Sequence, residues 1–247
     1  MNLAEKVVPY SESSDSKRVQ VEQMFNEIAP KYDGLNHTLS LGIDHYWRKK
    51  GIQALQSLAP KKIVDIAIGT GDLALEAYRL LQPEHIFGID ISENMMAVGK
   101  EKVLRKGLSE KITFERQDCT DLQFEDNTFD AATVAFGVRN FENLDRGLQE
   151  ILRVLRPGGK LMILELTTPQ YFPVKQGYWI YSKFIPLIGR FFSKETAAYH
   201  YLPKSIEAFP QNQKLTAILE KNGFTAVEYH PLTFGICASY LGSKKVS

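Results

Sequence analysis

The sequence predicts an α/β fold, with a central, mostly parallel sheet of seven strands and helices on both faces. Strand-like and helix-like apolar patterns alternate between residues 61 and 166, which implies parallel strands joined by right-handed crossovers. A turn of small residues at 67–71 joins the first strand to a helix. The length of 247 residues, 44% of them hydrophobic, suits one such domain with insertions.

The elements are expected in the following order along a single domain. Residues 1–17 are polar and predict a mobile N-terminus, and residues 18–57 predict a helical cap. Residues 170–204 predict a helical lid insertion, and residues 205–243 predict a helix near 211–222 and a hairpin that adds an antiparallel strand at one sheet edge. The core lies between the cap and the insertion, at 58–169, with strands at 62–66, 86–90, 111–116, 129–136 and 159–166 and helices at 72–81, 93–106 and 143–154.

The glycine turn after the first strand indicates a nucleotide-type ligand. Gly69 and Gly71 allow a tight turn and a close approach of the ligand, and Asp90 ends the next strand, where an acid can bind ribose hydroxyls. A dinucleotide site needs G-x-G-x-x-G, and Asp72 at the start of the helix would repel a pyrophosphate. A ligand with a sulfonium and an amino acid group, S-adenosylmethionine (SAM), fits better. We therefore expect a Rossmann-like fold of the class I SAM-dependent methyltransferase type.

Further candidate residues lie where the other strands end, because ligands of such sheets bind outside the carboxyl ends of the strands. Asp118 follows the third strand, where an adenine amino group needs an acceptor, although an ordinary turn aspartate would look the same. Arg139 and Asn140 follow the apolar fourth strand and should lie over the pocket. The full set of strand-end positions is Asp65 to Gly71, Asp90, Asp118 and Cys119, Ala135 to Asn140, and Glu165 onward.

Composition excludes several other classes of protein. A net charge of +1 gives no indication of a nucleic-acid partner. Cys119 and Cys237 have no metal-ligand spacing and indicate free thiols in a reducing compartment, and none of the five histidines has metal-ligand spacing. The N-terminus lacks an apolar signal region, and no apolar run reaches the ~18 residues of a spanning helix. We expect a cytoplasmic protein without a metal, at most peripheral to the inner face of a membrane.

Two longer segments carry a family resemblance. The segment Tyr32 to Trp47, and the segment Arg153 to Lys160 continued by Glu165 to Thr167, resemble the two signatures of the ubiquinone/menaquinone biosynthesis C-methyltransferases. Residues 136–140 and 201–210 also match, so that the resemblance spans residues 18–243. Three residues depart from the usual pattern, namely Leu35 in place of Met, Thr167 in place of Ser and Phe234 in place of Gly, whereas Ala67 is common in the family.

The resemblance implies a role for each cofactor-binding candidate. Thr70 would contact SAM within the glycine loop, together with Asp65, Gly69 and Gly71, and Asp90 would bind the ribose. Asp118 and the backbone of Cys119 would hold the adenine, and Ala135 would lie beside the methionine part. The implied acceptor is demethylmenaquinol, a dihydroxynaphthalene with a polyprenyl tail. The sequence leaves open whether a ubiquinol precursor also serves, how long the tail is, and whether the chain forms a homodimer.

The implied reaction methylates a ring carbon, which is a poor nucleophile until the adjacent hydroxyl loses its proton. Arg139 would supply positive charge for the phenolate and polarise a water, since a guanidinium cannot act as a base, and Asn140 would orient the hydroxyl or the water. Asp33, His37 and His45 of the cap are candidate proton acceptors, although a lone histidine is more often structural.

Several alternatives stay open. The aromatic and basic residues of 171–192 suit a lid at a lipid surface, or they form the core of a cap. The chain is also compatible with methylation of an oxygen or nitrogen of another small hydrophobic metabolite, and with a non-catalytic SAM- or lipid-binding module. A dinucleotide-dependent oxidoreductase is disfavoured by Asp72.

Overall fold

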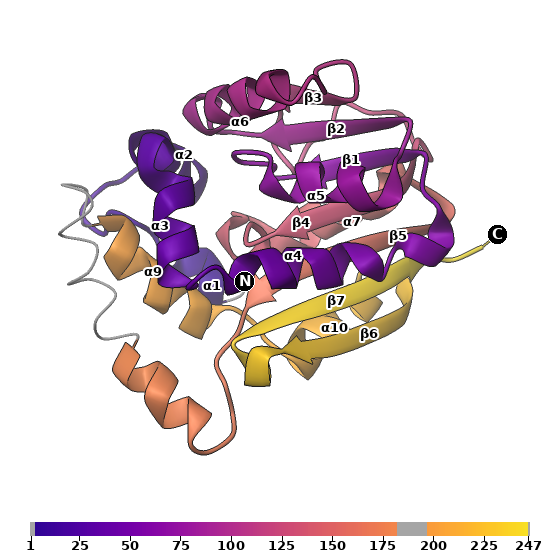
Figure 1. Cartoon of the computed structure of the whole chain (residues 1–247). Helices are drawn as coiled ribbons and strands as arrows, with labels where there is room; N and C mark the ends of the chain where they lie inside the picture. The colour runs from indigo at the N-terminus through magenta and orange to yellow at the C-terminus, as the bar shows by residue number, and fades with distance from the viewer. Residues whose placement is uncertain (1–2, 182–196, 247) are drawn as a thin grey trace.

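The computed structural model describes residues 3–181 and 197–246, which contain a seven-stranded sheet (Figure 1). Its order is β3-β2-β1-β4-β5-β7-β6. The strands β3, β2, β1, β4 and β5 are parallel to one another, and β7 is antiparallel to both β5 and β6. The predicted fold class is confirmed. The strands are β1 (Lys62–Ile66), β2 (His85–Asp90), β3 (Ile112–Arg116), β4 (Phe129–Ala135), β5 (Leu155–Leu166), β6 (Phe224–Leu232) and β7 (Cys237–Lys244).

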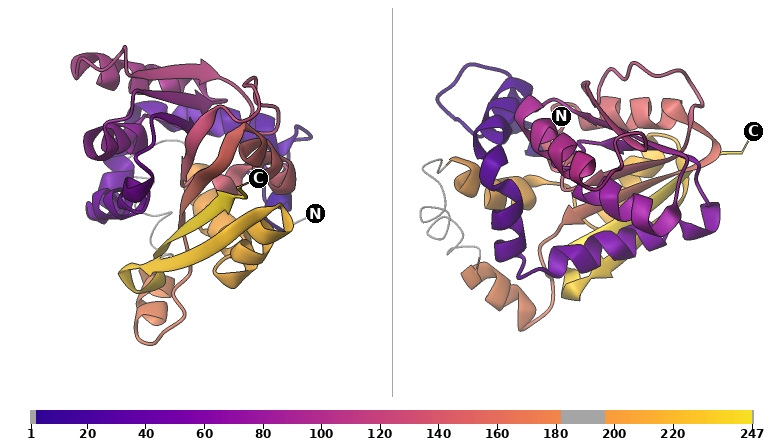
Figure 2. Two further views of the ribbon diagram at one scale, coloured as in Figure 1. Left: turned by 90° about the vertical axis from the view of Figure 1, so that its right-hand side faces the viewer. Right: turned by 45° about the horizontal axis from the view of Figure 1, so that its top comes forward.

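Helices cover both faces of this sheet (Figures 1 and 2). One face carries α4 (Ile43–Gln53), η2 (Gln56–Leu58), α5 (Asp72–Leu81) and α6 (Glu93–Arg105), and the other carries α7 (Leu144–Val154) and α10 (Gln213–Lys221). Each layer buries its own apolar cluster against the sheet. On α7 the buried positions 144, 148, 151 and 154 recur at helical spacing, and the Asn143 side chain caps the helix by accepting a hydrogen bond from Arg146 N.

Two details of the sheet correct the sequence-based expectation. The strand expected at 159–166 begins already at Leu155 in β5, where the pairing with β4 is irregular between Phe129 and Ala131 and Gly158 has a φ of 78°. Such an irregularity lets the chain bend without leaving the sheet. The antiparallel strand expected at the edge is β7, which lies inside the sheet, between β5 and β6.

The remaining helices lie beyond the carboxyl ends of the parallel strands (Figure 1). They are α1 (Leu3–Lys6), α2 (Lys17–Ile28), η1 (Ala29–Lys31), α3 (Tyr32–Leu39), η3 (Val138–Asn140), the helical residues 174–181 and α9 (Ala197–Ala208). Part of the expected lid insertion, 182–196, lies outside the described residues. The polar N-terminal segment is attached by the buried Lys17, whose Nζ donates to the carbonyls of Ala4 (2.8 Å), Arg139 (2.9 Å) and Phe141 (3.3 Å). Its composition did not predict this packing.

Candidate functional site

Three cavities open at the carboxyl ends of the strands, and Tyr32 and Phe136 line all of them. We name each cavity after a residue that lines that cavity and neither of the other two. The Arg139 cavity has a volume of about 150 Å³, the Asp90 cavity about 90 Å³ and the Asp65 cavity about 30 Å³. Because the cavities share two wall residues, ligands in them would be neighbours.

The Asp65 cavity lies over the glycine turn between β1 and α5. Gly71 has a φ of 82°, and a Cβ there would come within 3.2 Å of the Phe114 ring, so the turn needs a glycine. Asp65 is 1% exposed, and its Oδ1 accepts a hydrogen bond of 2.6 Å from Thr133 Oγ1. Its Oδ2 is buried and has no hydrogen-bond partner among the described residues. Burial raises the pKa of Asp65 to about 7. An unpaired buried carboxylate oxygen at a cavity is an acceptor for a cationic ligand group.

Arg48 of α4 lines the Asp65 cavity and also the Arg139 cavity. Its guanidinium is buried and ion-paired with Asp44, and its Cζ lies 5.6 Å from the centre of the Phe136 ring. Nη2 lies 3.6 Å from Asp72 Oδ2. Asp65 and Arg48 thus present opposite charges to one small cavity, which suits the ammonium and carboxylate of an amino acid. The sequence analysis missed Arg48, although it directly follows the signature that ends at Trp47.

The Asp90 cavity is organised by two backbone amides. Asp90 at the end of β2 accepts hydrogen bonds of 2.8 Å from Gly69 N and from Ser92 N, which fix its carboxylate at the cavity wall. Burial raises the pKa of Asp90 to about 6. Asp118 and Cys119 line the same cavity. Asp118 Oδ1 accepts from Thr120 N (2.8 Å), and Oδ2 lies 3.2 Å from Arg18 Nε.

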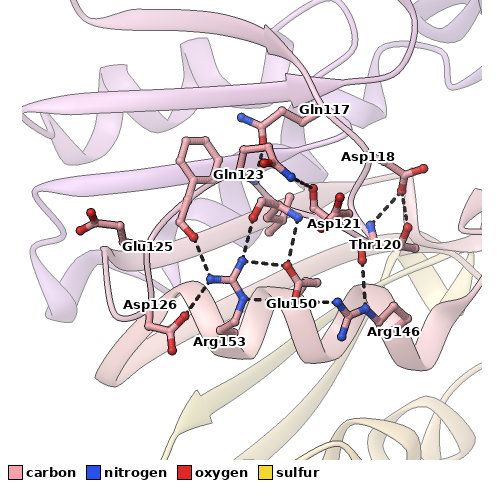
Figure 3. Close-up of polar contacts among 12 residues, drawn as sticks. Gln117, Asp118, Thr120, Asp121, Gln123, Glu125, Asp126, Arg146, Glu150 and Arg153 are labelled. Atoms are coloured by element: carbon pink, nitrogen blue, oxygen red, sulfur yellow. Dashed lines mark hydrogen bonds and ion pairs between the residues drawn. The ribbon is translucent and has the colours of Figure 1, made fainter.

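The loop that carries Asp118 and Cys119 is held against α7 (Figure 3). Arg153 donates to the carbonyls of Leu122 (2.8 Å) and Phe124 (2.7 Å), and Glu150 Oε2 accepts from Leu122 N (3.0 Å). Arg153 and Glu150 are themselves paired at 2.8 Å. Arg153, the first residue of the second signature, therefore positions this loop and touches no cavity.

The Arg139 cavity has a cationic wall. Arg139 of η3 is buried, and its Nη1 donates to Glu165 Oε1 (2.7 Å) and to the carbonyl of Phe136 (2.6 Å). Burial is the largest influence and lowers the pKa of Arg139, but the charge and hydrogen bond of the fully buried Glu165, together with Tyr32 and Tyr201, outweigh it, so that the pKa is raised and Arg139 stays charged. Arg139 Nε is buried and lacks a hydrogen-bond partner among the described residues. It is an available donor at the cavity, and an acceptor with negative charge would satisfy it.

Most of the rest of this cavity is aromatic or apolar, and Asn140 lies on the wall of the adjoining Asp90 cavity. Tyr201 donates to Asn140 Oδ1 at 3.0 Å, and Asn140 Nδ2 lies 3.4 Å from the carbonyl of Phe136. Burial raises the pKa of Tyr178 to about 12 and that of Tyr201 further, so both hydroxyls stay protonated at neutral pH. A flat aromatic ligand with a long apolar substituent fits such a wall. Its apolar lining consists of Met24, Phe25, Ile28, Leu35, Leu39, Trp47, Phe136, Leu166, Ala198, Leu202, Ile206 and Ile236.

The sequence of the chain was compared with known families and proteins. Residues 12–244 match the ubiE/COQ5 methyltransferase family.

The chain belongs to the ubiE/COQ5 methyltransferase family.

Two curated relatives illustrate the similarity. The demethylmenaquinone methyltransferase of Bacteroides fragilis is 57% identical over 241 residues, which are 97% of this chain and 98% of that protein. The demethylmenaquinone methyltransferase of Porphyromonas gingivalis is 46% identical over 246 residues, 99% of this chain and 100% of that protein.

Solved structures share the fold at low sequence identity. A SAM-dependent methyltransferase from Thermotoga maritima has a TM-score of 0.61 at 16% identity and covers 90% of this chain and 99% of its own. The [4+2]-cyclase SpnF has a TM-score of 0.68 at 18% identity, and the match covers 93% of this chain and 97% of that protein.

In this ubiE/COQ5 family member the predicted cofactor residues gather around two of the cavities. Asp65, Gly69 and Thr70 line the Asp65 cavity, Asp90, Asp118 and Cys119 line the Asp90 cavity, and Ala135 lines both. Gly69 also lines both. Gly71 lines neither cavity and instead starts α5 with its left-handed φ.

The candidate proton acceptors are placed differently. Asp33 Oδ1 accepts a hydrogen bond of 2.5 Å from Thr70 Oγ1, and its Oδ2 lies 2.7 Å from Lys102 Nζ. The exposed His45 ring stacks on His37 with 4.5 Å between centroids, and His37 Nδ1 lies 2.8 Å from Asp44. Asp33, His37 and His45 line none of the three cavities. The ring nitrogens and carboxylate of His37, Asp44 and His45 do lie within 4.8 Å of one another, a proximity that sequence spacing did not suggest.

The three departures from the family pattern lie in different environments. Leu35 lines the Arg139 cavity. Thr167 is buried, and its Oγ1 donates to the carbonyl of Gly235 at 2.8 Å, a bond that the usual serine would also make. Phe234 is 77% exposed, with a φ of 56°, and lines no cavity.

Proposed function

We propose that this chain transfers the methyl group of SAM to a ring carbon of demethylmenaquinol and so produces menaquinol. The observation that carries the proposal is the unpaired Nε of the charged Arg139, in an aromatic cavity that shares walls with the Asp90 and Asp65 cavities. Supporting it, the relatives that bear the name demethylmenaquinone methyltransferase align over nearly the whole chain.

SAM would lie along the Asp90 and Asp65 cavities. Asp118 and the Cys119 backbone would hold the adenine, and Asp90 the ribose hydroxyls. The unpaired Oδ2 of Asp65 would accept the ammonium group, and Arg48 would bind the carboxylate. Its sulfonium methyl would then point across Tyr32 and Phe136, the walls common to all three cavities, into the Arg139 cavity.

In the proposed reaction a quinol hydroxyl loses its proton to water, and the phenolate oxygen lies against Arg139. The electron-rich ring carbon attacks the methyl group, the sulfur–methyl bond breaks toward neutral S-adenosylhomocysteine, and the ring carbon then releases its own proton to water. Arg139 stabilises the charge of the phenolate, and Asn140, held by Tyr201, orients its oxygen. In this proposal Asp33 and His45 take no part in these steps, because neither lines any of the three cavities.

The proposal includes further statements about partners. The proposed transfer uses no metal ion, because the sulfonium is already an activated methyl donor. The proposal includes no nucleic-acid partner. No helix of the described residues is long and apolar enough to cross a membrane. We place the enzyme in the cytoplasm, with the polyprenyl tail of the substrate drawn from the inner face of the membrane. A homodimer is compatible with the proposal, because the residues assigned to SAM and to the quinol all belong to one chain.

The test is an incubation with SAM and a short-chain demethylnaphthoquinol, read by mass spectrometry. We expect one added methyl group, no product from the oxidised quinone without a reductant, and less product from a benzoquinol of the same tail length. The rival methylation of an oxygen is separated by mild oxidation, because a C-methylated quinol oxidises to the quinone and a mono-ether does not. Turnover of the unreduced quinone would contradict the phenolate mechanism.

A further inference from the structure

Several large apolar side chains are exposed near one end of the molecule. Leu41 is 86% exposed, Phe172 80% and Phe234 77%. Leu41 and Phe234 also have left-handed backbone conformations, with φ of 51° and 56°. A bulky side chain disfavours this conformation, and exposure to water gives it no compensating burial. Folding alone therefore does not explain Leu or Phe at these positions, and the family pattern places glycine at the latter.

Residues close in sequence to Leu41 and Phe234 line the Arg139 cavity. Leu41 directly follows Ser40, a residue of the cavity wall. Phe234 lies between Ile236, also of the wall, and Thr233, whose Oγ1 accepts a hydrogen bond of 2.7 Å from Trp47 Nε1.

The helical residues 174–181 also contribute to this wall. Their last residue, Tyr181, lines the cavity and donates to the carbonyl of Leu39 at 2.7 Å, while Ile180 is exposed. Figures 1 and 2 show this helix beside the turn between β6 and β7. We call the segments 40–46, 171–181 and 232–236 together the apolar rim.

The exposed lysines in and beside the apolar rim give its surface a basic character. Asp44 is the only acidic residue in its three segments, and this side chain is buried and paired with Arg48. Lys175 is exposed within the rim, and Lys49 and Lys50 are exposed beside it. Lys50 Nζ lies 5.9 Å from the centre of the half-exposed Tyr46 ring. Exposed aliphatic and aromatic side chains flanked by lysines suit the interface of an anionic bilayer. There the apolar side chains enter the acyl region, and the ammonium groups of the lysines contact the anionic headgroups.

We propose that the apolar rim docks the protein on an anionic lipid bilayer and brings the mouth of the Arg139 cavity to the membrane surface. This inference rests on the proposed function, since a polyprenyl quinol resides in the bilayer and would otherwise have to cross water to reach Arg139. Docking places the tail beside the mouth of the cavity. Insertion of the Leu41 and Phe234 side chains into lipid accounts for two bulky residues at positions whose backbone conformation favours glycine.

The strained backbone provides a test that misfolding cannot mimic. Glycine relieves the positive φ, so the double variant Leu41→Gly, Phe234→Gly should keep or raise the melting temperature. We expect at least a tenfold loss of its partition onto vesicles of phosphatidylglycerol and phosphatidylcholine, measured by flotation. Leu104→Ala removes a side chain of similar exposure on α6, outside the rim, and should partition like the parent protein. Vesicles of phosphatidylcholine alone, or added salt, should reduce binding of the parent.

Three results would overturn the inference. The first is that the parent protein does not bind anionic vesicles, and the second is that the double variant binds them as well as the parent does. The third is that the double variant differs from the parent in oligomeric state, which would make the rim an interface between copies of the chain. The double variant should methylate a short-chain, water-soluble quinol at the parent rate and lose efficiency only on vesicle-embedded quinol. If the parent binds vesicles but does not methylate the soluble quinol, the proposed function fails and the docking surface stands.

Discussion

Lowering the pH from 7.5 to 6 should weaken SAM binding, and Asp65 should account for most of the effect. Its carboxyl group is fully buried, Oδ2 has no partner, and burial raises the pKa to about 7. The ammonium group of the ligand needs the carboxylate form. A protein molecule that carries the proton must therefore release it on binding, and the affinity falls as the pH falls through this pKa.

The size of the effect follows from that pKa. At pH 7 roughly half of the molecules carry the proton, and at pH 6 roughly nine-tenths do. The apparent affinity should drop roughly five- to tenfold between pH 7.5 and pH 6, which is about 1–1.4 kcal/mol. Asp90, with a pKa of about 6, adds up to about twofold in the same direction. The range ends at pH 7.5 because the α-amino group of the ligand itself titrates just above it.

Titration calorimetry in two buffers of different protonation enthalpy measures both the affinity and the protons released. Asp65→Asn is the matched control, because an amide oxygen still accepts the hydrogen bond of Thr133 but the group no longer titrates. The variant should bind SAM more weakly than the parent protein. Its affinity should also change less between pH 7.5 and pH 6, because residue 65 no longer titrates. A parent protein whose affinity is constant from pH 6 to 7.5, with no protons released, would refute the assignment of Asp65 to the ammonium group.

Four further outcomes are expected. Asp65→Asn should raise the free energy of unfolding at pH 8 by up to about 4 kcal/mol without ligand, because the raised pKa costs the parent protein stability progressively from about pH 4 to pH 7, and the full cost remains above pH 7. Arg48→Lys should reduce the preference for SAM over decarboxylated SAM about tenfold in equilibrium binding, since an ammonium cannot make the bidentate contact. Arg139→Lys should lower kcat by ~10²-fold, or about 2.7 kcal/mol, with little change in SAM affinity. Asp33→Asn and His45→Gln should each keep kcat within about threefold in steady-state assays, because neither residue lines a cavity.

The sequence predicted the core of the fold because local signals and tertiary packing agree there. The strands at 62–66 and 86–90 and the helices at 72–81 and 93–106 differ from the observed bounds by one residue at most. Gly69, Asp90 and Asp118 lie at strand ends, and the parallel topology alone brings such ends to one edge. Their gathering at two cavities thus follows from the alternation of strands and helices.

The sequence could not predict contacts that depend on how the cap meets the sheet. The cap was expected as one unit over 18–57, yet α4 packs on the sheet face, with Trp47 and Ile52 in the core. This packing brings Arg48 to the Asp65 cavity, whereas Asp33 points to Thr70 and Lys102. Helical periodicity defines the buried side of a helix but not the partner that this side meets.

The charges of the Arg139 cavity support water as the proton acceptor in the proposed reaction. Arg48, Arg139 and Lys31 line it, and Asp44 is the only carboxylate among the described lining residues. Burial raises the pKa of Asp44, but hydrogen bonds from Ser40, Arg48 and His37, together with the charge of Arg48, outweigh burial and hold it at about 2. Such a carboxylate accepts no proton at neutral pH. In the proposed reaction the excess positive charge would lower the pKa of a bound hydroxyl, so that water would suffice as the acceptor of its proton.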